Sequence, residues 1–197
     1  MSDEEQQGVL AGQAVISFAT APCCEAWFAE HSADHRGIWL KIGKTGAAQT
    51  VTYLEALDVA LCHGWIDGQK RGYNATYWLQ RLTPRGPRSK WSQINRDKAE
   101  ALIKAGRMRQ AGQAQVDAAK ADGRWAAAYA GQKSATVPDD LAAALAADPQ
   151  AKAFFETLKG ANRYAILYRV HDAKKPETRA ARIAKLIEMC HNHETVH

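Results

Sequence analysis

Two groups of residues in the middle of the chain carry side chains suited to chemistry. The first is the segment Cys62–Gly68, in which the carboxylate of Asp67 stands two residues after the indole of Trp65. The second is the loop Thr83–Ser92, in which cations crowd a turn beside another Trp. Charged groups near the centre of a domain cost free energy unless a partner satisfies them. We therefore take this stretch of the chain as the candidate site.

Asp67 is the candidate catalytic residue. A carboxylate beside an indole in a half-buried strand can have a raised pKa and act as a general acid or base. The alternative is a structural carboxylate, tied to Arg81 or Arg85 or to backbone amides in the turn at Gly68. Acid–base catalysis usually needs a second titratable group within reach. His63 is the nearest in sequence, but a histidine is favoured at a helix C-terminus for other reasons.

The loop around Arg85, Lys90 and Trp91 has the better case for binding. Arginine forks hold carboxylates or phosphates through two parallel hydrogen bonds, and an exposed indole can stack on a ring. The alternative is an internal salt network in which Trp91 packs as a lid on the core. The positive charge extends to further cations near the loop: Lys70, Arg71, Arg96 and Lys98.

Charge is distributed unevenly along the 197 residues, whose formal net charge is +5. Residues 67–109 hold eleven Lys or Arg against Asp67, Asp97 and Glu100, whereas residues 1–36 hold six acids against Arg36. A basic patch of this kind favours phosphates, nucleic acid, anionic lipid or an acidic partner. Alternatively, it pairs with the acidic N-terminus of the same chain. Nucleic-acid binding has no recognised motif behind it, neither zinc-finger spacing nor a Gly-rich phosphate loop.

The composition also indicates where the protein is located and whether it holds a metal or a cofactor. No apolar run approaches the roughly 20 residues of a membrane-spanning helix, and the acidic start lacks the features of a secretory signal. We therefore expect a cytoplasmic protein without a membrane span. The four cysteines include no CxxC pair, and the tail around Cys190, His191, His193 and His197 fits no structural zinc spacing. No metal and no cofactor is predicted.

Hydrophobic periodicity and capping signals predict an α+β fold. The N-terminal lobe, residues 14–94, is expected to hold a small antiparallel sheet with helices, and the C-terminal lobe, residues 95–197, to be all helical. Thr52 and Glu55 have the spacing of a capping box at the start of a helix that ends at Gly64. The expected strands are 14–18, 38–42, 65–70 and 76–82. The expected helices are 22–31, 52–64, 95–106, 112–122, 139–147, 149–159, 162–172 and 176–191.

Several motifs resemble the YdeI/OmpD-associated family over roughly residues 26–197. They are Ala60-Leu61-Cys62-x-Gly64-Trp65-Ile66-Asp67-Gly68, Thr83-Pro84-Arg85 with Trp91-Ser92 and Asn95, Gly106-Arg107-Met108, Ala119-Lys120-Ala121-Asp122-Gly123-Arg124-Trp125, Asn162-Arg163-Tyr164-Ala165 and Lys175-Pro176-Glu177-Thr178-Arg179. The helical C-terminal part resembles the OmdA-type domain of that family. The resemblance implies a soluble stress or defence protein, of the kind called "bacteriocin-protection", and implies no reaction and no cofactor.

The sequence thus favours a non-enzymatic protein that binds an anionic ligand or a protein partner. Tyr164, Lys175 and Arg179 of the helical part are expected to border the surface. The expected binding residues of the first part are Trp65, Asp67, Arg81, Arg85, Lys90 and Trp91. The first alternative is an enzyme on an anionic or peptidic substrate, with Asp67 as acid or base and Arg85 as anchor. The second is nucleic-acid binding.

Overall fold

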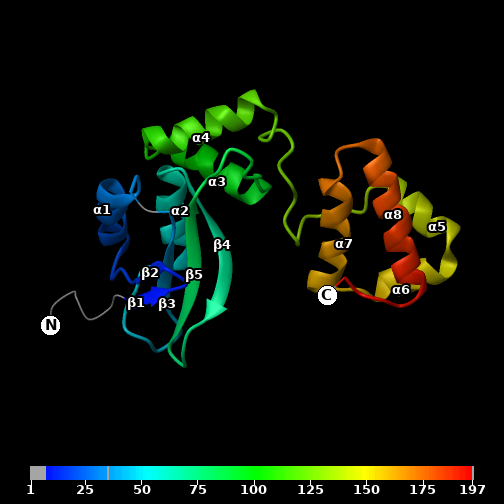
Figure 1. Cartoon of the computed structure of the whole chain (residues 1–197), viewed down its shortest axis with the longest axis horizontal. Coiled ribbons are helices and arrows are strands. Elements are labelled where there is room, and N and C mark those ends of the chain that lie inside the picture. Colours follow the sequence, from blue (N-terminus) through cyan, green and yellow to red (C-terminus); the bar gives the residue numbers. More distant parts are fainter. Residues whose placement is uncertain (1–7, 35, 197) are drawn as a thin grey trace. The chain divides into compact units, whose positions relative to one another are not determined.

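The computed structural model describes residues 8–34 and 36–196, and its chain divides into two units. The first unit holds the described residues up to Trp91 together with 95–127, and the second holds 92–94 together with 128–196. Figure 1 shows the sheet in the first unit and helices in the second. The acidic residues Asp3, Glu4 and Glu5, which we considered as partners of the basic patch, lie outside the described residues.

A five-stranded sheet forms the centre of the first unit, and it confirms the predicted α+β class. Its order is β1-β2-β3-β5-β4, where the strands are β1 (Gly8–Leu10), β2 (Gln13–Ile16), β3 (Ile38–Gly43), β4 (Trp65–Gly72) and β5 (Tyr77–Pro84). The strands expected to form an antiparallel sheet, β3, β4 and β5, pair in that way, and β2 adds to β3 in parallel, so the whole sheet is mixed. The reason is the helix between them, because a crossover connection returns the chain in the same direction whereas a hairpin reverses it.

Helices α1 (Ala21–His31) and α2 (Tyr53–Cys62) contribute to the core on one face of this sheet. The Thr52 hydroxyl accepts from the Glu55 amide and the Glu55 carboxylate accepts from the Thr52 amide, so the predicted capping box is confirmed. The strands contribute alternate residues to this core, as the period of two requires. Its fully buried members include Phe28, Ile38, Leu40 and Leu82.

Two glycines let α4 (Gln110–Ala121) approach the C-terminal end of α2. Gly64 follows that end with φ +76°, a conformation that favours glycine. A Cβ at Gly112 would lie 2.3 Å from the carbonyl oxygen of Cys62 and 2.6 Å from that of Leu61. The Arg109 amide also donates to the Cys62 carbonyl at 3.2 Å. The loop between β5 and α3 (Gln93–Lys104) is tied to the same place, because the Arg85 amide donates to the Gly64 carbonyl.

The second unit consists of α5 (Asp139–Ala147), α6 (Pro149–Thr157), α7 (Gly160–Asp172) and α8 (Pro176–His191). Asp148 caps α6 by accepting from the Ala151 amide at 3.0 Å. Each helix contributes an apolar stripe to one core. Its most buried members include Leu141, Ala151, Val170 and Cys190.

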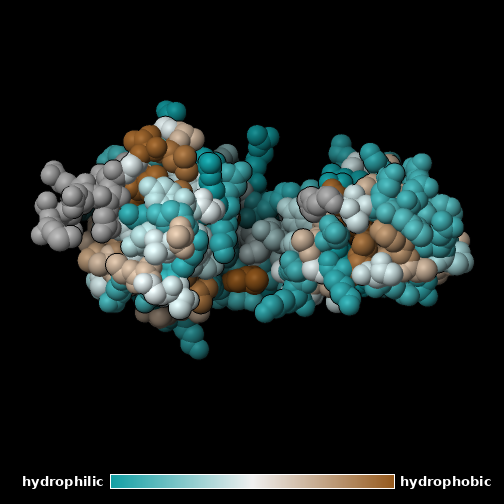
Figure 2. Space-filling view, turned by 90° about the horizontal axis from the view of Figure 1, so that it is seen from below, coloured by the Kyte–Doolittle hydropathy of each residue, from teal (hydrophilic) through white to brown (hydrophobic). Residues whose placement is uncertain are grey.

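Hydrophilic side chains dominate the face shown in Figure 2, and hydrophobic ones form small separate groups. The most exposed large hydrophobic residues are Val9, Leu54, Ile94 and Tyr73. Among the residues that the structure describes, no helix combines the length and the apolar character needed to cross a membrane.

Candidate functional site

The loop after β5 is a tight turn fixed by its own hydrogen bonds. The Ser89 amide donates to the Gly86 carbonyl at 3.0 Å, and the Gly86 amide donates to the Ser89 hydroxyl at 2.9 Å. Pro87 occupies the second position of this turn, where its fixed φ is favourable. The turn leaves the side chain of Arg88 exposed.

Arg85 and Trp91, at the two ends of this loop, form a buried stack. The guanidinium carbon of Arg85 lies 3.5 Å from the centre of the Trp91 ring, and Nη1 donates to the Lys90 carbonyl at 3.2 Å. Arg85 is 5% exposed and Trp91 is 2% exposed. The indole of Trp91 is therefore packed inside the first unit, and it holds the guanidinium in a fixed plane.

Residues from the end of α4 and from the turn after it continue the stack. Trp125 meets Trp91 edge-on with ring centres 4.8 Å apart, and the Lys120 ammonium lies 5.4 Å from the centre of the Trp125 ring. Arg124 donates to the Ser89 carbonyl at 2.9 Å and pairs with Asp122 at 2.7 Å. We name this assembly the cation–indole cluster; it consists of Arg85, Arg88, Lys90, Trp91, Lys120, Arg124 and Trp125.

Sequence reasoning missed the half of the cluster that comes from α4 and the turn after it. Lys120, Arg124 and Trp125 were recognised only within a motif of the family resemblance and were not assigned to a site. The available signal was a second Trp flanked by cations, the same composition that drew attention to the first loop. Nothing in the sequence indicated that the two Trp-bearing segments meet, since Trp91 and Trp125 stand 34 positions apart.

Asp67 is held by two neutral donors. The Tyr53 hydroxyl donates to Oδ2 at 2.8 Å, and the Asn95 side-chain amide donates to Oδ1 at 3.3 Å. Burial first, and then the adjacent Asp67 charge, raise the pKa of Tyr53 well above its ordinary value. The hydrogen-bond donors to Asp67 are thus Tyr53, in the first turn of α2, and Asn95, and these differ from the Arg81 or Arg85 that we considered. His63 instead packs against Phe28, with ring centres 5.6 Å apart.

Trp65 and Arg81 occupy different surroundings from the cluster. Trp65 is 2% exposed and packs edge-on against Phe28 at 5.1 Å between ring centres, so it belongs to the core. Arg81 is half-buried on β5, opposite Trp39 of β3, and its Nε is buried with no hydrogen-bond partner among the described residues. The structure therefore brings Arg85, Lys90 and Trp91 together and places Trp65 inside the unit.

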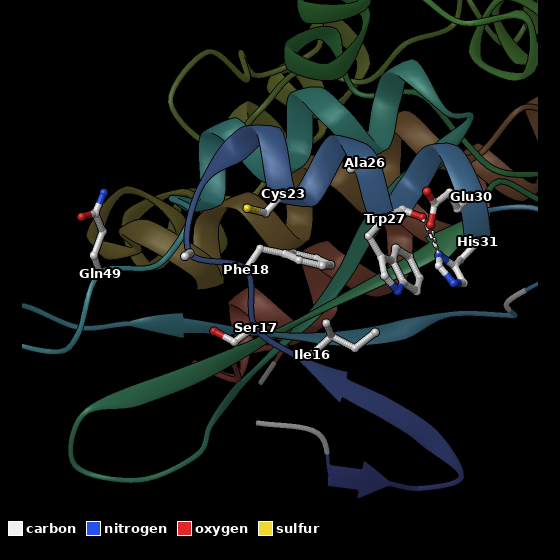
Figure 3. A pocket seen from close by; sticks show the side chains of 10 residues that line it. Ile16, Ser17, Phe18, Cys23, Ala26, Trp27, Glu30, His31 and Gln49 are labelled. Carbon is white, nitrogen blue, oxygen red and sulfur yellow. Dashed lines mark hydrogen bonds and ion pairs between the residues drawn. The ribbon is translucent and has the colours of Figure 1, made fainter. Parts of the chain in front are cut away.

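A cavity of about 410 Å³ lies beside α1, between that helix and the chain after β2. Figure 3 shows Cys23 and His31 at opposite ends of the helix, with Trp27 between them. His31 stacks on Trp27 and its Nδ1 is 3.1 Å from the Trp27 carbonyl oxygen. His31 follows Cys23 by eight positions along the helix, which is about 12 Å of rise. The thiol and the imidazole are therefore too far apart to act as a nucleophile–base pair.

The three expected residues of the second unit have their own contacts there. Arg179 pairs with Asp140 and donates Nη1 to the Val170 carbonyl at 2.8 Å. The Tyr164 hydroxyl donates to the Ala130 carbonyl at 3.0 Å. Lys175 is exposed immediately before α8.

Within the described residues, no group of three His, Cys, Asp or Glu side chains has a geometry that could hold a metal ion. The histidines of the tail have other neighbours: His191 lies 2.9 Å from Asp148, and His193 stacks on Phe154. His197 lies outside the described residues.

Comparisons with known protein families divide the chain in two. Residues 16–115 match the model of a domain of unknown function (DUF8412), which therefore covers half of the chain. Residues 134–193 match the family described as bacteriocin-protection, YdeI or OmpD-associated, so the expected OmdA-type domain is confirmed over this part. The resemblance was expected from about residue 26, and the model that matches the N-terminal part is DUF8412. No curated protein and no solved structure matches the chain.

Proposed function

We propose a binding function for this chain, which belongs to the DUF8412 family. Its ligand is anionic, and it is held at the cation–indole cluster of the first unit. The observation that carries this proposal is the guanidinium of Arg85 at 3.5 Å over the Trp91 ring, with the exposed Lys120 over the Trp125 ring and the exposed Arg88 on the turn of the same loop.

The geometry suits an anion because the stack of Arg85 on Trp91 fixes the loop that carries Arg88. Arg85 itself is 5% exposed, so the exposed cations would make the direct contacts with the ligand. Arg88 and Lys120 are long, exposed side chains that can close on a phosphate or carboxylate from the rim. Trp125 is half-exposed and offers an indole face to any ring attached to the anion.

Asp67 supports a binding function over an enzymatic one. Its carboxylate accepts hydrogen bonds from Tyr53 on α2 and Asn95 on α3, and it stands on β4. It thereby links three elements that surround the loop. Such a carboxylate anchors the framework of the site. A general base must instead accept a proton from the substrate, and both oxygens of Asp67 already accept hydrogen bonds from the protein.

The test compares two double variants with the same change of net charge. Arg88→Glu/Lys120→Glu alters the cluster, and Arg36→Glu/Lys104→Glu alters exposed cations elsewhere in the first unit. Binding of pyrophosphate, ATP and a single-stranded hexanucleotide is measured by titration calorimetry and by the change in Trp emission. We expect the cluster variant to bind at least about tenfold more weakly and the control within about threefold of the wild type.

Three outcomes separate the possibilities. Equal losses in the two double variants would show unspecific attraction to net charge, and a wild type that binds none of the three probes would contradict the proposal. Binding of the hexanucleotide alone, with a steep dependence on salt, would assign the cluster to nucleic acid.

A further inference from the structure

A second cavity, of about 250 Å³, lies within the second unit. One wall is a single face of α7, since Tyr164, Leu167, Tyr168 and His171 recur at helical spacing. The opposite wall is the chain before α5, with Tyr129, Ala130, Ala135, Thr136 and Pro138, and Gln93 completes the lining. We call this cavity the tyrosine pocket.

Three tyrosine rings form the corner of the pocket. Tyr129 and Tyr168 meet at 86° with ring centres 5.1 Å apart, and Tyr164 lies 6.0 Å from Tyr168 at 45°. The hydrogen bond from the Tyr164 hydroxyl to the Ala130 carbonyl fixes one ring against the opposite wall. Burial and the neighbouring tyrosines raise the pKa of Tyr164, so its phenol is neutral at physiological pH. Two tyrosine rings that meet at a wide angle offer a ligand the flat face of one ring and the edge of the other.

The polar groups of the pocket suit a hydrogen-bonding edge. Nε2 of His171 is buried and makes no hydrogen bond within residues 8–34 and 36–196. A buried polar atom without a partner is costly, and a ligand atom can supply that partner. Gln93 lines the same cavity with an amide that both donates and accepts. No Lys, Arg, Asp or Glu is among the described residues that line the pocket.

We propose that the tyrosine pocket binds a small, uncharged, planar heterocycle of the nucleobase type, stacked on the α7 tyrosines and hydrogen-bonded at its edge by His171 and Gln93. A sugar lacks the flat face that three rings match, and a quaternary ammonium ion has no hydrogen-bonding edge for the imidazole. A phosphate finds no cation in the lining. This site is separate from the cation–indole cluster and does not depend on it.

The first experiment uses the full chain and neutral probes: adenosine, guanosine, cytidine and uridine, with choline and glucose as comparators. Affinity is measured by ligand-observed NMR and calorimetry on wild type, Tyr168→Leu, His171→Leu and His171→Gln. Tyr73→Leu, an exposed tyrosine on the β4–β5 turn, is the matched control. We expect one or more nucleosides to bind. We further expect about tenfold weaker binding in Tyr168→Leu and His171→Leu, no change in Tyr73→Leu, and partial recovery in His171→Gln.

A second measurement uses the wild-type chain alone, so it does not depend on whether a variant folds. Intermolecular NOEs between a bound nucleoside and the Tyr164 and Tyr168 rings would place the ligand in the pocket. Binding of choline or glucose without any nucleoside, NOEs to other aromatic residues only, or no nucleoside binding at millimolar concentration would overturn the proposal.

Two further comparisons show whether the bound heterocycle is free or part of a nucleic acid, and distinguish binding in the tyrosine pocket from binding at the cation–indole cluster. A hexanucleotide is compared with free nucleosides, which distinguishes a base within a chain from a free one. AMP is compared with adenosine in the Arg88→Glu/Lys120→Glu background, where the proposed anion site is weakened. Equal affinities of AMP and adenosine for this double variant support a neutral ligand. A gain of tenfold or more from the phosphate in that background would contradict it.

Discussion

Arg85 in the first unit and Arg179 in the second were both predicted to bind a ligand, but their surroundings differ. Arg179 forks onto the Asp140 carboxylate, with Nη2 2.8 Å from Oδ1, and also donates to the Val170 carbonyl. Its guanidinium thereby joins the start of α5 to the end of α7. Arg85 lies on an indole and donates to a backbone carbonyl, in a cluster with four further cations.

The difference shows what decides the role of an arginine. A guanidinium that meets an internal carboxylate has its charge balanced and serves to hold helices together. An indole attracts a guanidinium through its ring electrons, so Arg85 fixes the loop between β5 and α3 against Trp91. The partner of Arg179 stands 39 positions earlier in the chain, and this separation hides the distinction from sequence reasoning. The following predictions test the comparison.

The largest effect is expected from Trp91→Ala. This change removes a fully buried indole, leaves a cavity, and exposes one face of the buried Arg85 guanidinium. We expect the free energy of unfolding to fall by about 3–5 kcal/mol. Urea denaturation followed by circular dichroism measures it, with Trp91→Phe as the control that retains a ring. A loss below about 1 kcal/mol would show that the stack contributes little to the first unit.

A smaller loss is expected from Gly112→Ala. The new Cβ would lie 2.3 Å from the Cys62 carbonyl oxygen, so α4 must move away from α2. We expect a loss of about 2–3 kcal/mol. Because α4 carries Lys120 and leads to Arg124, the affinity for pyrophosphate should fall as well. Gly72→Ala is the matched control, since nothing lies within 4 Å of a Cβ at that position. Similar melting and affinity in the two variants would contradict the close packing described here.

Sequence reasoning was most successful where a structure depends on neighbours in the chain. The Thr52 cap, the helix 139–147 and the helix 176–191 agree with the structure to the residue, because capping and helical periodicity act within a few positions. The strand 38–42 is likewise confirmed within one residue.

Sequence reasoning failed where segments distant in the chain meet in the fold. The parallel pairing of β2 with β3, the Tyr53–Asp67 hydrogen bond and the contact of Trp91 with Trp125 all join residues well separated in the sequence. The short strand β1 was also missed, because its three residues carry no clear period. The predicted site residues therefore include the loop of the cation–indole cluster but none of the residues that α4 and the turn after it contribute.

Asp67→Asn tests the framework beneath the cluster. The Tyr53 hydroxyl can still donate to the new amide oxygen, but the amide nitrogen then faces the Asn95 donor. We expect a loss of about 1–2 kcal/mol, measured by thermal and urea unfolding. Affinity for pyrophosphate should change by less than about threefold, since Asp67 anchors the elements and does not touch the ligand. A large loss of affinity with unchanged stability would instead place Asp67 in the ligand site. Glu100→Gln, an exposed carboxylate on α3, is the control.

The smallest effect concerns Arg179 and Asp140, and it depends on pH. The hydrogen bonds from Arg179 hold the pKa of Asp140 below its usual range. The pair therefore contributes stability at pH values above the ordinary pKa of an aspartate, and this contribution is lost as the pH falls through the lowered pKa of the folded state. Asp140 is 44% exposed, so solvent screening limits the contribution to less than about 1 kcal/mol. Arg179→Ala should lower stability by this amount near pH 7 and should differ least from the wild type near pH 2. Asp140→Asn removes the titrating carboxylate, so its difference in stability from the wild type should vary with pH as that of Arg179→Ala does. Lys175→Ala changes an exposed neighbour and should show no such variation. A constant difference between wild type and Arg179→Ala at every pH would assign the role of Arg179 to its bond with the Val170 carbonyl, which does not titrate.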